Sequence, residues 1–216
     1  GSYNVAFGES ALRANTTASN NTAVGKSSLA ANTTGYDNIA VGHSALLVNT
    51  TGHDNVSMGN GALDANTTGN SNTAIGRIAL GANTTASDNV AVGQSALSLN
   101  TTGANNTAVG RSSLAANTTG TGLVSIGYQA LTASTGDNNT AVGYQALLDN
   151  TSAANGTAVG YHALKACYAS SNTAVGAFSM QTNTTGTRNV AVGVSSAESN
   201  TTGSDNISIG HDALKL

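Results

Sequence analysis

The sequence predicts an all-β protein built as a parallel solenoid, in which each repeat forms one coil of about 17 residues. Near-copies of the pentapeptide at 106–110 begin thirteen times, at a spacing of 17 residues ten times and 16 residues twice. The second residue of every copy is β-branched, the fourth is apolar, and the third is Ala or Ser. This alternation indicates a strand whose second and fourth side chains share one face, opposite the small third residue.

The fifth residue of every copy is glycine. A glycine at the end of a strand commonly supplies a positive φ or room for a close backbone approach. We therefore expect a corner of the coil at this position, where any Cβ would collide with the next coil. The corner glycines include Gly25, Gly42, Gly76, Gly93, Gly110, Gly127, Gly143 and Gly160.

The remainder of each coil predicts an outer wall and a closing turn. A leucine column begins four residues after the corner glycine, and segments such as 94–100 are too short to distinguish an outer strand from a single helical turn. The Asn-Thr-Thr-Gly sequence that follows is turn chemistry. We expect its asparagines, such as Asn49, to stack along the solenoid as a hydrogen-bonded ladder.

The chain reads as a single repeat domain, because no linker or change of composition interrupts the period. The opening Gly1-Ser2 is interpreted as a cloning scar. Residues 3–216 then form twelve full coils and a partial thirteenth, which we interpret as a fragment of a longer fibre.

A single copy of this chain would leave the bulky strand residues exposed. Only the small third residue of the pentapeptide fits the inside of a narrow coil. The second and fourth residues therefore point outward and form an apolar stripe. Monomeric proteins rarely expose such a stripe, and packing it around a symmetry axis removes it. We therefore expect a homotrimer, intertwined or side by side. Its core candidates are Val24, Val41, Ile75, Val92, Val109, Ile126 and Val142.

The repeated Asn-x-Ala-Val/Ile-Gly pentapeptide resembles the head repeat of trimeric autotransporter adhesins. Longer stretches, such as 139–147 with the Asn-Thr-Ser that follows, are similar to repeats of phage tail-fibre-like proteins and bacterial surface fibres. The resemblance covers essentially the whole chain. It implies a left-handed parallel β-roll and a role in attachment at the cell surface, in the extracellular space or on a virion fibre. The coil exceeds that of the adhesin head by roughly its Asn-Thr-Thr-Gly segment, so the resemblance describes the strand better than the outer wall.

Composition excludes several classes of function. A formal net charge of −3 with 8% charged residues is too weak and too mixed for a nucleic-acid or anionic-membrane surface. No apolar stretch is long enough for membrane insertion. The residues suggest no cofactor, no metal centre and no catalytic constellation, so we expect no enzyme. His53, Asp54 and Asp37 could approach a cation, but solvated turn residues are the simpler interpretation. The lone Cys167 is interpreted as a small buried thiol.

Aromatic residues form the most distinctive local feature. Tyr128, Tyr144 and Tyr161 occupy one variable column in successive coils, with His162 and Tyr168 nearby. Tyrosine faces suit sugar rings, which makes these five residues the candidates for ligand contact and a cell-surface glycan or receptor the expected partner. The alternative is a ladder that only stabilises the stack.

The predicted function is a structural or adhesive segment of a trimeric surface or tail fibre. A solenoid that binds ice or a crystal surface is the alternative, because the coils are rich in threonine. Adjacent threonines in a strand would face opposite ways, however, so Thr-Thr is better explained as a turn. A catalytic β-helix acting on polysaccharide would need clustered carboxylates, which the sequence lacks. Asn-Thr-Thr also matches the N-glycosylation signal, but stacked asparagines about 4.8 Å apart leave no room for a glycan on each.

Overall fold

The computed structural model describes residues 1–215, which divide into two units, the first spanning Gly1–Asn106 and the second beginning at Thr107. The described residues contain thirteen strands of three residues each. Those of the first unit are β1 (Val5–Phe7), β2 (Thr22–Val24), β3 (Ile39–Val41), β4 (Val56–Met58), β5 (Thr73–Ile75) and β6 (Val90–Val92). Those of the second are β7 (Thr107–Val109), β8 (Val124–Ile126), β9 (Thr140–Val142), β10 (Thr157–Val159), β11 (Thr173–Val175), β12 (Val190–Val192) and β13 (Ile207–Ile209).

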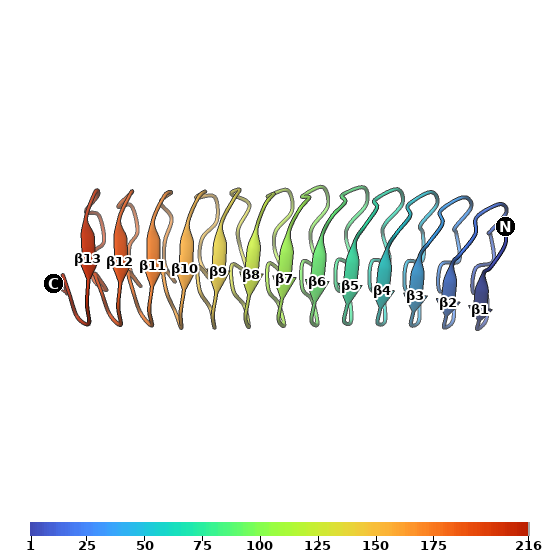
Figure 1. Ribbon diagram of the computed structural model, residues 1–216, viewed down its shortest axis with the longest axis horizontal. Helices are drawn as coiled ribbons and strands as arrows, with labels where there is room; N and C mark the ends of the chain where they lie inside the picture. The colour runs from blue at the N-terminus through green and yellow to red at the C-terminus, as the bar shows by residue number, and fades with distance from the viewer. Residues whose placement is uncertain (216) are drawn as a thin grey trace. The chain divides into compact units, whose positions relative to one another are not determined.

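Within each unit the strands pair in parallel and in chain order, one strand per coil (Figure 1). The pairing is in register with the repeat, so that Ala23 of β2 lies opposite Ala40 of β3. The same register holds across a 16-residue coil, where Thr157 of β10 lies opposite Thr173 of β11. Each sequence column is therefore stacked on its own copies. The prediction of a parallel β-solenoid is confirmed.

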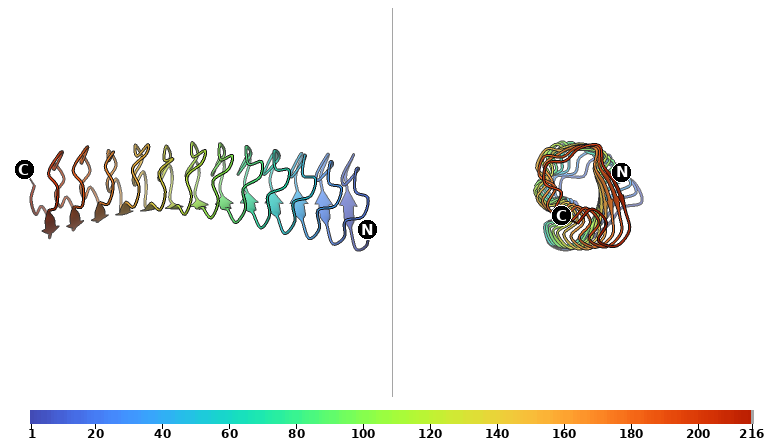
Figure 2. Two further views of the ribbon diagram at one scale, coloured as in Figure 1. Left: turned by 90° about the horizontal axis from the view of Figure 1, so that it is seen from above. Right: turned by 90° about the vertical axis from the view of Figure 1, so that its left-hand side faces the viewer.

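The inside of each coil is narrow and filled by small strand residues and the leucine column. Each coil closes on itself as a loop that carries its strand on one side (Figure 2). Ala23 and Ala108, at the middle of their strands, are fully buried, as are Leu29 and Leu114 on the opposite wall. The flanking strand residues point outward and are partly exposed. The burial pattern agrees with the alternation in the sequence.

The outer wall is neither the strand nor the helical turn that the sequence left open, so both interpretations were wrong. Residues after the corner glycine form successive turns in which Ser112 and Leu114 have φ values of +57° and +51°. Positive φ values thus occur at every second residue, which directs backbone groups toward the neighbouring coil. One example is the hydrogen bond from the N–H of Leu114 to the carbonyl oxygen of Ala130, at 3.2 Å. The described residues contain no helix, and hence none long and apolar enough to cross a membrane.

Candidate functional site

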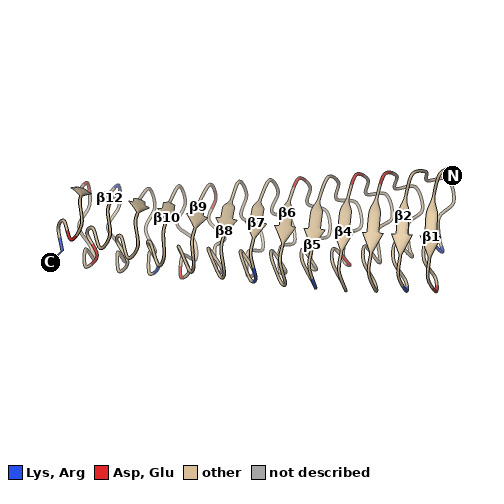
Figure 3. Ribbon diagram, turned by 60° about the horizontal axis from the view of Figure 1, so that its bottom comes forward, with Lys and Arg blue, Asp and Glu red and all other residues tan. Residues whose placement is uncertain are grey.

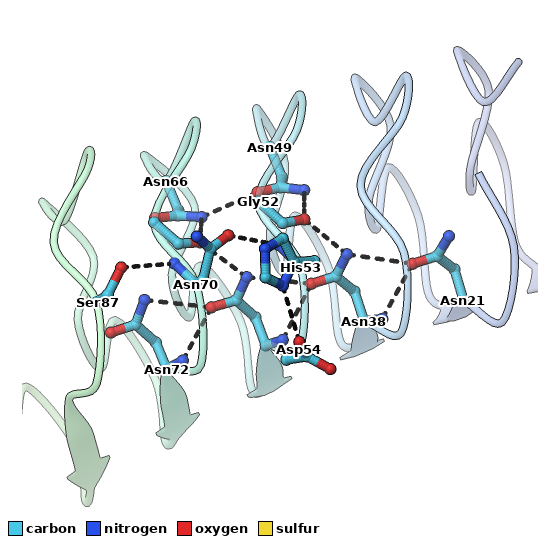
Figure 4. Close-up of polar contacts among 12 residues, drawn as sticks. Asn21, Asn38, Asn49, Gly52, His53, Asp54, Asn66, Asn70, Asn72 and Ser87 are labelled. Atoms are coloured by element: carbon cyan, nitrogen blue, oxygen red, sulfur yellow. Dashed lines mark hydrogen bonds and ion pairs between the residues drawn. The ribbon is translucent and has the colours of Figure 1, made fainter. Parts of the chain in front are cut away.

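The asparagine that precedes most of the strands lies inside the coil and bonds to its own copy in the next coil. The backbone N–H and the side-chain Nδ2 of Asn38 both donate to Oδ1 of Asn21, at 3.0 and 3.2 Å. The same Nδ2 donates to the carbonyl oxygen of Gly52 at 2.9 Å. Figure 4 shows these contacts of Asn38, and the two bonds to the preceding asparagine recur at Asn55 and, in the second unit, at Asn189. We did not expect this ladder from the sequence, where its only signal is the asparagine that stands before most of the strands.

In the first unit the asparagines of the Asn-Thr-Thr turns form a second internal ladder, which confirms the prediction for that part of the column. Asn49 is fully buried, and its Nδ2 donates to Oδ1 of Asn32 and to the carbonyl oxygen of Gly52, both at 2.9 Å. The next residue, Thr50, donates its hydroxyl to the carbonyl oxygen of Thr67 at 3.0 Å. The buried amide of Asn49 cannot carry a glycan in the folded coil, and the threonines serve the turn.

The corner glycines have backbone angles that disfavour other residues. All eight of those named from the sequence have φ between +128° and +140°. At Gly110 a Cβ would lie 2.5 Å from the carbonyl oxygen of Gly127 in the next coil. This position thus requires glycine both for its φ and for the close approach of two backbones.

The strands present an uncharged outer surface, which we call the strand face: the second and fourth residues of the pentapeptide copies in each unit. No Lys, Arg, Asp or Glu occurs in any strand, and the charged residues lie on the connecting segments (Figure 3). The seven trimer-core candidates all lie on this face and are partly exposed; Ile75 and Ile126 are the most exposed of them. The fourth residue of each pentapeptide copy thus gives the strand face a regular apolar column within each unit.

Tyr128, Tyr144 and Tyr161, here called the tyrosine row, stack on one another in the second unit. The ring centroids are 5.3 Å apart in both pairs, with interplanar angles of 18° and 14°. Arg111 lies 5.9 Å from the centroid of Tyr128, and the ring of His162 stacks on Tyr161 at 4.0 Å. Tyr144 lies between the other two rings, so both of its faces are covered and cannot stack on a sugar. Phe178 adds an edge-on contact to Tyr161 at 5.2 Å.

A hydrogen-bonded ladder runs beside the tyrosine row. Nε2 of His162 lies 2.9 Å from Oε1 of Gln145, and Nε2 of Gln145 donates to Oε1 of Gln129 at 2.8 Å. Burial and the charge of Lys165 lower the pKa of His162, which favours the neutral ring. We assign the proton to Nε2, since the nearby amide oxygen can only accept. Tyr168 is 52% exposed and takes part in none of the ring contacts among the described residues, so the structure separates it from the other four candidates.

The tyrosine row coincides with the coils in which the internal asparagine ladders are interrupted. Leu123 and Gly156 replace the asparagine before the strand, and Ser134 and Cys167 replace that of the turn. Asn150, between the two turn replacements, has a buried Nδ2 with no partner among the described residues. Stacked aromatic pairs contribute about 0.5–1.5 kcal/mol each beyond area burial. The row thus adds coil-to-coil attraction in coils where both asparagine columns contain replacements.

The remaining polar candidates form no site for a metal. The His53 ring stacks on Tyr36 at 4.6 Å, and its Nδ1 lies 2.8 Å from Oδ2 of Asp54. Within residues 1–215 no three His, Cys, Asp or Glu side chains are grouped closely enough to hold a metal ion. Cys167 is buried, as predicted, and burial raises the pKa of its thiol. The described residues also enclose no pocket.

Taken with the in-register columns, these ladders define the class of the chain: it is a β-solenoid repeat protein. No protein-family model, curated protein or solved structure matches it.

Proposed function

We propose that this chain is a structural and adhesive segment of a trimeric fibre at a cell surface or on a phage tail. The observation that carries the proposal is the uncharged strand face, in which outward Val, Ile and Thr side chains repeat at every coil. Because each column is in register with the coil period, a second copy presents the same spacing and can pack against it throughout the paired length. We propose left-handed coils and three chains whose strand faces meet at a common axis.

Val109→Asp tests this assembly. The unaltered protein is expected to scatter light as about three times its 21.1 kDa chain mass, and the variant as a single chain. Val109 is only partly buried within its own chain, so a carboxylate there is compatible with the folded coil. In the trimer, three carboxylates would lose water near one another at the axis, which is strongly unfavourable.

Thr119→Asp provides the matched control, because it adds the same charge at an exposed turn position away from the strands. It should remain trimeric. Circular dichroism should show the same β-solenoid in all three proteins. A single-chain mass for the unaltered protein would contradict the proposed trimer, as would an undiminished mass for Val109→Asp.

For the adhesive role we propose a cell-surface glycan or receptor as the partner and the tyrosine row as the contact. Support comes from the exposure of the three tyrosines, one per coil, beside the hydrogen-bonded ladder of Gln129, Gln145 and His162. Contact would be made through the parts of the rings that do not stack on one another. In a trimer, three such rows would act together and raise weak single-site binding through avidity.

Replacing all three tyrosines with serine should abolish binding to a glycan array or to target cells. The fold should persist, because Asn60 and Ala177 occupy the same column in other coils, but with a stability lower by about 1–3 kcal/mol from two lost ring pairs. Tyr168→Ser is the control, since that ring is exposed and separate. Undiminished binding by the triple variant would leave the tyrosine row with a structural role only.

A second candidate function is binding to an ice or crystal surface. One observation favours it: Thr140, Thr157 and Thr173 lie in register on β9, β10 and β11, each on the same outer face as a valine two residues later. This arrangement differs from the Thr-Thr turns and provides the alternate spacing that a flat lattice requires. Thermal hysteresis from a monomeric protein would support this function over the trimeric fibre.

A further inference from the structure

We propose that the tyrosine row is an oxidative cross-linking site, at which a one-electron oxidant joins neighbouring rings of the same chain as dityrosine. The product would be a covalent staple between successive coils. The proposal is independent of any adhesive role of the row, because it requires only the spacing and exposure of the three rings.

The geometry places three phenols where each can react with a neighbour. The rings stack with centroids 5.3 Å apart and planes within 18° of parallel, so equivalent carbon atoms face one another along the row. The side chains are 37%, 44% and 45% exposed, which gives an oxidant access and leaves the rings room to turn. Exposed side chains reorient in picoseconds to nanoseconds. A radical on one ring therefore meets the next ring as an intramolecular partner, at a high effective concentration.

The reaction balances with hydrogen peroxide as oxidant and a haem peroxidase as catalyst. Each of two phenols gives up one electron and one proton to form a phenoxyl radical. The radicals form a carbon–carbon bond between ring positions adjacent to the hydroxyl groups. Each ring regains aromaticity as the hydrogen on the bonded carbon leaves as a proton and the phenol oxygen takes one up. One peroxide molecule accepts the two electrons and two protons and becomes two water molecules.

The position of the row gives the staple a structural consequence. Its coils contain the four replacements that interrupt the internal ladders, so local opening should be easiest there. A bond from Tyr144 to Tyr128 or to Tyr161 would close a loop of one coil. Such a link would reduce the conformational freedom of the opened segment, and hence favour the closed coil.

The test treats the intact protein with peroxidase and peroxide. We expect dityrosine fluorescence, a chain mass lower by two hydrogen atoms, and migration as a single chain on denaturing electrophoresis. Digestion should yield a linked peptide pair containing Tyr144 with Tyr128 or Tyr161. Tyr3, Tyr36 and Tyr168 serve as internal controls and should not appear in linked peptides of the same chain, because none of them stacks on another tyrosine among the described residues.

Two variants separate proximity from general reactivity. Tyr144→Ser leaves Tyr128 and Tyr161 two coils, about 10 Å, apart, so the intrachain cross-link should be lost. Tyr128→Ser keeps the other stacked pair and should still form it. Equal dityrosine yields from Tyr144→Ser and the unaltered protein would overturn the proposal. So would cross-links found only between chains, or a protein that forms no dityrosine at all.

Discussion

Gly110→Val is expected to destabilise the protein by about 4 kcal/mol or to prevent the coil from folding. Two effects add at this position. The backbone has a φ of +128°, a region that a β-branched residue strongly avoids. A Cβ would also lie 2.5 Å from the carbonyl oxygen of Gly127 and 2.7 Å from its carbonyl carbon. Both contacts are with backbone atoms of the next coil, so the clash cannot be relieved by rotating a side chain.

Ala108→Ser is the matched control, since it changes a buried residue two positions earlier in the same coil. Serine already occupies the equivalent position at Ser57 and Ser125, where the hydroxyl donates to a carbonyl oxygen five residues later, at 2.7 and 2.8 Å. We expect the control to change the free energy of unfolding by less than about 1 kcal/mol. The two variants should be compared by thermal or urea denaturation. Equal midpoints would show that the corner tolerates a side chain and that the positive φ is not its essential feature.

Asn55→Ala is expected to cost about 2–4 kcal/mol, because it removes a fully buried link of the first internal ladder. The side-chain oxygen of Asn55 accepts the backbone N–H of Asn72 at 3.0 Å and its Nδ2 at 3.2 Å. In the variant, the backbone N–H of Asn72 would remain buried without this acceptor. The loss should appear as a lower free energy of unfolding and as faster amide hydrogen exchange in the coils on both sides.

Asn60→Ala is the matched control, because it makes the same substitution in an exposed column. It should change the free energy of unfolding by about 0.5 kcal/mol or less. Comparing the two variants separates the effect of breaking the ladder from the effect of replacing any asparagine with alanine. If both substitutions had the same small effect, the internal hydrogen bonds would contribute little net stability. A large cost confined to Asn55 would establish the ladder as a main source of cohesion between coils.

Much of the strand side of the coil could be predicted, because the local backbone conformation and the narrow interior restrict which residues fit there. A β-branched residue, a small residue and an apolar residue at period two indicate a strand with one crowded face, and the buried Ala108 beside the partly exposed Val109 has this pattern. The invariant glycine indicated the corner for similar reasons. Each of these inferences rests on a residue type, β-branched, small or glycine, that indicates a narrow range of backbone conformations.

The outer wall could not be predicted, since its conformation is not preferred by its residues. Leucine gains nothing locally from a φ near +50°, as at Leu114, and the conformation costs about 1–2 kcal/mol for such a residue. It is maintained by hydrogen bonds to the next coil and by burial of the leucine, both of which are tertiary effects. For Tyr144, likewise, the sequence located the column but not the plane of the ring. Whether its faces would be open or covered depended on Tyr128 and Tyr161 turning parallel to it.

The in-register stacking of the coils has a consequence for how such a chain can change length. Because the strand, glycine and leucine columns meet similar residues above and below, removing one complete period, such as residues 38–54, would bring together surfaces that already match. Removing half a period would instead place glycine corners against leucines and asparagines against strand residues. Length in this protein is therefore adjustable in whole coils, and both 16-residue coils also carry replacements in the two asparagine columns. Genetic duplication or loss of one repeat would alter the number of coils while keeping the strand, glycine and leucine columns in register.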